Sequence, residues 1–96
     1  MPRKKPAPKS MDVKDILAAR HTTHGDFGDV AKFSQEMRGY YRMQPGWRRL
    51  SSVQQETIEY IIHKHARIMN GDPNFRDHWV DQVGYLERVI ERLPEE

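Results

Sequence analysis

Hydrophobic residues recur every three or four positions from residue 12 onward, which is the period of an amphipathic α-helix. No stretch alternates between apolar and polar residues for long enough to make a β-strand. The pattern therefore predicts an all-α fold over residues 11–96, a single domain resembling a four-helix bundle with a short first helix and three longer ones.

Acidic residues mark the starts of the first two predicted helices. The first is expected from Asp12 to about Arg20, and the segment 21–26 is expected to interrupt it. Asp26 is a good N-cap for a second helix that ends near Met43, before Pro45 and Gly46. The positions expected to be buried in the second helix are Phe27, Val30, Ala31, Ser34, Met37 and Tyr41.

The third and fourth helices are predicted from a capping box and from apolar spacing. Ser52 and Gln55 match a capping box, and Asn70-Gly71 is typical of a helix end. The apolar face expected on the third helix is Ile58, Ile61, Ile62, Ile68 and Met69. Asp72 or Asn74 is expected to cap the fourth helix, in which Gly84 indicates a close helix approach or room for a ligand. The apolar residues of that helix follow spacings of 4, 3, 4 and 3, the seam of a bundle helix that faces the core: Trp79, Val83, Leu86, Ile90 and Leu93.

Charge separates the start of the chain from the rest. Residues 1–10 contain four cations, three prolines and no acid, so we expect a disordered basic tail that could contact nucleic-acid phosphates weakly. There is no cysteine, and no apolar run reaches the length of a membrane span. These features predict a cytoplasmic protein with no membrane partner. Only 36% of its residues are hydrophobic, so we expect a homo-oligomer, most simply a dimer, to enlarge the core.

Acidic and basic side chains follow the polar sides of the third and fourth helices. Glu56 and Glu59 lie one turn apart on the third helix. If the two helices pack antiparallel, Asp77 and Asp81 of the fourth helix could join them in a Mg²⁺ site that also accepts Mn²⁺. Lys64 and Arg67 would then bind the phosphates of a nucleotide. A solvated face with ion pairs within each helix fits the same spacing.

Four further residues are candidates for a binding site. His24 and Asp26 flank Gly25, which permits a tight turn at a helix start where free N–H groups could hold an anion. His63 lies on the carboxylate side of the third helix and could hydrogen-bond Glu59. Tyr85 belongs to the aromatic stretch of the fourth helix.

Three motifs in the chain resemble those of a known family. The motifs His24-Gly25-Asp26, Lys64-x-x-Arg67-Ile68 and Asp77-x-Trp79-x-Asp81-x-x-Gly84-Tyr85 resemble the pattern of small phage and prophage proteins of unknown function. That family is similar to the all-α nucleoside triphosphate pyrophosphohydrolases of the MazG kind. The resemblance covers about residues 16–90 and implies Mg²⁺-dependent release of pyrophosphate, by a dimer or tetramer in the host cytoplasm.

The resemblance assigns catalytic and metal-binding roles to Glu56 and Glu59, and a metal-binding role to Asp81. Gln55 and His78 stand where the enzymes have glutamates. Asp77 is a possible substitute for the second of these. We therefore leave open whether the chain is an enzyme. The alternatives are a non-catalytic nucleotide binder or regulator, such as a phage counter-defence sponge, a DNA-associated accessory protein, and a helical dimer without a ligand.

Overall fold

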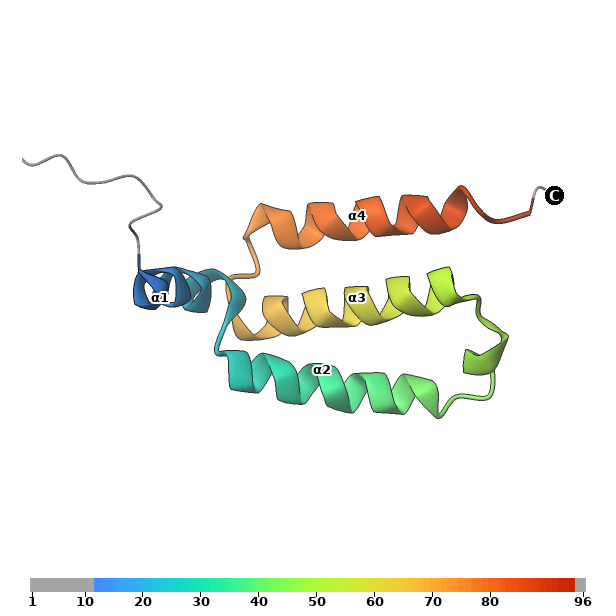
Figure 1. The fold of residues 1–96 in the computed structure, drawn as a ribbon, viewed down its shortest axis with the longest axis horizontal. Helices are drawn as coiled ribbons and strands as arrows, with labels where there is room; N and C mark the ends of the chain where they lie inside the picture. Colours follow the sequence, from blue (N-terminus) through green and yellow to red (C-terminus); the bar gives the residue numbers. More distant parts are fainter. Residues whose placement is uncertain (1–11, 95–96) are drawn as a thin grey trace, which may run out of the picture.

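The computed structural model describes residues 12–94 and is helical almost throughout that range (Figure 1). Its elements are α1 (Val13–His24), α2 (Phe27–Arg42), the short 3₁₀-helix η2 (Trp47–Arg49), α3 (Ser52–Asn70) and α4 (Arg76–Ile90). No β-strand occurs among the described residues, which confirms the predicted all-α class. None of the described helices combines the length and apolar character needed to cross a membrane. The predicted basic tail, residues 1–10, lies outside the described residues.

Three of the helices form a single layer. Helices α2, α3 and α4 run side by side with α3 in the middle, and α1 lies at the end of the layer where α2 begins and α3 ends (Figure 1). Helix α3 packs against both neighbours. Because α2 and α4 lie on opposite sides of α3, much of the surface of the outer helices has no helix packed against it.

Local caps account for most helix boundaries. Asp12 and Asp26 each accept a hydrogen bond from the backbone N–H three residues later. The predicted N-cap Asp26 is confirmed, whereas Asp12, expected as the first residue of its helix, is the N-cap of α1. The capping box lies one residue earlier than predicted and is formed by Ser51 and Gln54. The predicted cap of the fourth helix is wrong: its N-cap is Phe75, which makes no side-chain capping bond.

Helix α1 is longer than predicted and ends at His24, not near Arg20. Histidine and threonine have only moderately low helix propensity, so they do not stop a helix that has already formed. The helix ends at Gly25, whose φ of 85° lies in a region that favours glycine.

Gly25 also allows the α1–α2 turn to lie directly on the α3–α4 turn. A Cβ atom built on Gly25 would overlap the backbone of Asn70, and one built on Gly71 would overlap the Thr23 carbonyl group. That same carbonyl oxygen accepts a hydrogen bond of 3.0 Å from the N–H of Asp72. This crossing of two turns holds α1 against the end of α3.

The core of the described chain is small. Its buried apolar residues are Val30, Ile62 and Ala66, and Ser34 is also buried. The predicted burial of Val30, Ser34 and Ile62 is confirmed, whereas Ala66 was not predicted. The prediction for Phe27 is wrong, since its side chain is 78% exposed at the start of α2. Tyr41 is also exposed, and α2 packs mainly against α3, which covers only one side of it.

The predicted seam of α4 does not face the core. Its five residues are each 46% to 64% exposed: Trp79, Val83, Leu86, Ile90 and Leu93. Helix α4 instead turns an adjacent side toward α3, where Tyr85 stacks on Tyr60 with ring centroids 3.8 Å apart. The expectation for Gly84 is also wrong as regards close packing, because a Cβ atom there would meet nothing within 4 Å.

Candidate functional site

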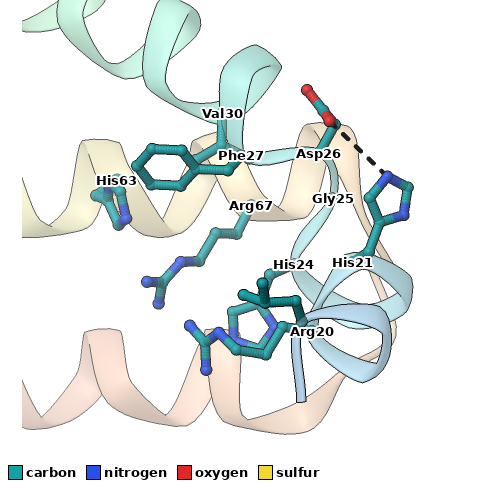
Figure 2. Close-up of a pocket in the computed structure, with 10 residues that line it drawn as sticks. Arg20, His21, His24, Gly25, Asp26, Phe27, Val30, His63 and Arg67 are labelled. Carbon is teal, nitrogen blue, oxygen red and sulfur yellow. Dashed lines mark ion pairs between the residues drawn. The ribbon is translucent and has the colours of Figure 1, made fainter. Parts of the chain in front are cut away.

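An open cavity of about 370 Å³ lies between α1, the start of α2 and the C-terminal half of α3 (Figure 2). A cavity of this volume is at the lower end of the range found for small-molecule sites. Its lining is Leu17, Arg20, His21, His24, Gly25, Asp26, Phe27, Val30, His63 and Arg67. Four of these were predicted as candidate site residues: His24, Asp26, His63 and Arg67.

Two guanidinium groups extend into the same space. Arg67 reaches it from α3 and Arg20 from α1 (Figure 2). Neither forms an ion pair with any carboxylate among residues 12–94. Partial burial and the nearby charge of Arg20 lower the pKa of Arg67, although a guanidinium remains protonated near neutral pH. Asp81, which is bonded to Lys64, lies near enough to raise the pKa of Arg67 but makes no ion pair with it, so the positive charge of the cavity is only partly offset.

Two histidines complete the polar lining. Burial, together with the charges of Arg20 and Arg67, lowers the pKa of His24 to about 4. Burial and the charges of Arg67 and Arg38 lower the pKa of His63 to about 4 as well. Both imidazoles are therefore neutral at pH 7 and offer hydrogen bonds rather than charge.

His78 fixes the first turn of α4 against the end of α1. Its side chain is fully buried, and its Nε2–H donates to the Thr23 carbonyl oxygen at 2.9 Å. The His24 ring meets the His78 ring edge-on, with centroids 4.8 Å apart. His78 thus connects α4 to α1 and packs against His24.

Asp26 takes no part in neutralising the two arginines. Its carboxylate points away from their guanidinium groups, toward His21, whose Nε2 is 4.0 Å away (Figure 2). The same carboxylate accepts the N–H of Asp29. One of the N–H groups expected to be free for an anion at this helix start is therefore already bonded.

The structure separates the two predicted phosphate-binding residues. Arg67 lines the cavity, but Lys64 is only 4% exposed and its Nζ lies 2.6 Å from Asp81 Oδ2. That hydrogen bond lowers the pKa of Asp81. Lys64 also lies 5.2 Å from the centroid of the Tyr60 ring. Lys64 therefore connects α3 to α4 and does not line the cavity.

The predicted metal ligands are not brought together. Glu59 faces α2, where Arg42 binds both carboxylate oxygens, at 2.6 and 2.8 Å, and Arg38 lies 3.9 Å away. Asp81 pairs with Lys64. Glu56 and Asp77 are exposed. No group of three or more histidines, aspartates or glutamates in the described part of the chain could hold a metal ion. The donor set does not fit the predicted Mg²⁺ or Mn²⁺ site.

Tyr85 also lies apart from the cavity. It stacks on Tyr60 between α3 and α4, and the Arg88 guanidinium lies 5.3 Å from its ring centroid. Its position is that of an interhelical packing residue.

Arg20 is the residue that the sequence analysis missed. The prediction ends the first helix at about Arg20, whereas in the structure the interruption begins only at Gly25. Once the helix runs to His24, Arg20 and His24 lie four residues apart on the same side. The extended helix was therefore the signal that would have joined Arg20 to the site.

No protein-family profile, curated protein or solved structure matches the chain. The resemblance to the phage family and to the MazG-like enzymes therefore stays a prediction based on the three short motifs.

Proposed function

We propose that the chain binds a nucleotide through its phosphate groups, in the cavity between α1, α2 and α3. The observation that supports this most directly is the convergence of Arg20 and Arg67 without a carboxylate partner. Planar guanidinium groups match phosphate oxygens with two parallel hydrogen bonds, and both donors are available here.

The other lining residues suit the remainder of such a ligand. His24 and His63, neutral at pH 7, can hydrogen-bond phosphate or ribose oxygens. Phe27 stands exposed at the edge of the cavity and offers an aromatic face on which a base can stack. The site thus combines charge for phosphate with an apolar surface for a base.

Binding without turnover is the form of this function that we favour. Hydrolysis of the MazG kind needs carboxylates that hold Mg²⁺ beside the phosphates. Glu59 is held by Arg42, and Asp81 by Lys64. A regulator or nucleotide-sequestering role requires no such carboxylates, so it fits the described side chains better than a pyrophosphohydrolase does.

Phosphorus NMR with a panel of NTPs and dNTPs, with Mg²⁺ and with chelator, tests the proposal. We expect shifted or broadened nucleotide signals and no new products. The Arg67→Gln variant should bind at least about 10-fold more weakly, since a hydrogen bond to a charged group contributes about 1.5–3 kcal/mol. Arg48→Gln is the matched control, because Arg48 is exposed in η2 at the opposite end of the layer.

Three results would contradict parts of this proposal. Release of pyrophosphate would make the protein an enzyme. Unchanged spectra across the panel would exclude nucleotide binding. Equal affinity of Arg67→Gln and the unmodified chain would place the ligand elsewhere.

A further inference from the structure

Helix α4 and the turn after it expose a row of large apolar side chains. We call the five residues at spacings of 4, 3, 4 and 3 the α4 stripe, of which the first four lie on α4 and the last lies just beyond its end at Ile90: Trp79, Val83, Leu86, Ile90 and Leu93. The stripe contains no charged residue. The stripe has five large apolar residues, whereas the described chain buries three apolar residues.

The stripe is built to pack against another helix. Its spacing is the heptad seam along which two helices interdigitate their side chains. The indole N–H of Trp79 donates to the Pro73 carbonyl oxygen at 2.8 Å, so the only polar atom of that side chain is already bonded. An open recess of about 410 Å³ at the same end of α4 includes Trp79, Val80 and Val83 in its lining and can receive an apolar side chain.

We propose that a second copy of this chain covers the α4 stripe, so that two α4 helices pack stripe against stripe about a two-fold axis. A two-fold interface uses the same patch on both partners, and an uncharged stripe meets its own copy without repulsion between like charges. This proposal assigns the interface of the homo-oligomer expected from the sequence to the α4 stripe. The stripe is distinct from the lining of the cationic cavity, so this inference does not depend on nucleotide binding.

The exposed apolar area is enough for the centre of an interface with a second copy. At roughly 150 Å² or more for a large side chain, the five half-exposed residues leave on the order of 400 Å² of apolar surface in water. Two stripes together bury about twice that area, which is less than the roughly 1,000 Å² expected of a specific interface, so neighbouring residues must also take part. Val80, 49% exposed in the same recess, is one of them. Burial of this surface adds to a small core, and a second copy is present wherever the chain is.

Sedimentation velocity of the full chain at several concentrations tests the proposal. We expect a species of twice 11.4 kDa. The Leu86→Lys variant, changed at the centre of the stripe, should raise the dimer dissociation constant at least about 100-fold. Val13→Lys is the matched control, because Val13 is 68% exposed on α1, away from α4, and should leave the dimer intact.

A second measurement keeps the proposal testable if Leu86→Lys does not fold. The chain contains no cysteine, so Leu86→Cys and Val13→Cys each provide a unique thiol. A short bismaleimide should link Leu86→Cys into a covalent dimer and leave Val13→Cys unlinked. A monomeric unmodified chain, an unperturbed Leu86→Lys dimer, or equal cross-linking of the two cysteine variants would each overturn the proposal.

Discussion

Two regions of the fold have no complementary partner within the described chain: the cavity beside α1 and the α4 stripe. In the cavity, Arg20 and Arg67 carry charge that no described carboxylate pairs with. In the stripe, apolar side chains remain in water. Unmatched charge in a concave site favours a small anionic ligand, whereas an unmatched apolar stripe on a convex helix favours another protein surface. Under the two proposals, the chain therefore has two independent kinds of partner, a nucleotide and a second copy of itself.

The largest expected loss of stability comes from a substitution that displaces α1 from the end of α3. Gly25→Ala places a Cβ atom against the backbone of Asn70 and forces a φ of 85° on an L-residue, so we expect at least about 3 kcal/mol of lost stability. Nucleotide binding should be lost with the displacement of α1, while the α4 stripe keeps its structure. Urea unfolding and sedimentation of the same sample measure the two effects.

The matched control is Gly84→Ala, at a helical glycine whose added Cβ would meet no atom within 4 Å. This change should stabilise the protein by up to about 1 kcal/mol. An equal loss of stability in both variants would contradict the role assigned to the crossing of the two turns.

A double comparison tests whether the two regions are independent. Arg20→Gln should weaken nucleotide binding by about 10-fold and leave the dimer unchanged, because a hydrogen bond to a charged group contributes about 1.5–3 kcal/mol. Leu86→Lys should dissociate the dimer and leave the nucleotide affinity of the folded monomer unchanged. Calorimetric titration and sedimentation of both variants provide the measurement. If either variant changes both properties, the cavity and the stripe belong to one coupled site.

Lys64→Met distinguishes a structural lysine from a phosphate ligand. Because Lys64 is paired with Asp81 between α3 and α4, its loss should cost about 1–2 kcal/mol of stability, less than a fully buried pair would. Nucleotide affinity should change less than threefold, in contrast to Arg67→Gln. A large loss of nucleotide affinity at unchanged stability would show that Lys64 binds the nucleotide.

The smallest effect is a dependence on pH. His24 and His63 have folded-state pKa values of about 4, below the unfolded value of about 6.5. The unfolded state therefore binds more protons between these values, and stability should decrease as the pH falls from 6.5 to 4. Both side chains are partly solvated, so we expect on the order of 1 kcal/mol for each. Urea unfolding at several pH values, compared with His24→Gln and His63→Gln, checks the sign.

The affinity of the protein for sulfate, whose charge is constant over this pH range, provides a second test of the same histidines. A bound anion favours the imidazolium form, so it should raise their pKa values and bind more tightly as the pH falls. Sulfate affinity that does not change between pH 7.5 and 5.5 would show that the histidines do not face the anion.

Local signals predicted much of the fold. The N-cap Asp26 and the end of α3 at Asn70 follow from hydrogen bonds between neighbouring residues, which the sequence displays directly. The predicted end of α1 near Arg20 is wrong because residues 21–24, whose helix propensity is moderate, continue the helix. That single error concealed Arg20, and with it one of the two guanidinium groups of the cavity.

The helical class, most helix boundaries and the apolar period of α4 can be read from the amino-acid sequence, because they depend on contacts within a few residues. Which side of each helix faces its neighbour depends on how the helices pack together. This packing turns Glu59 toward Arg42 and Asp81 toward Lys64, and it leaves Arg67 beside Arg20. The physical reason is that burial and ion pairing belong to two surfaces together, so the pattern on one helix cannot specify them alone.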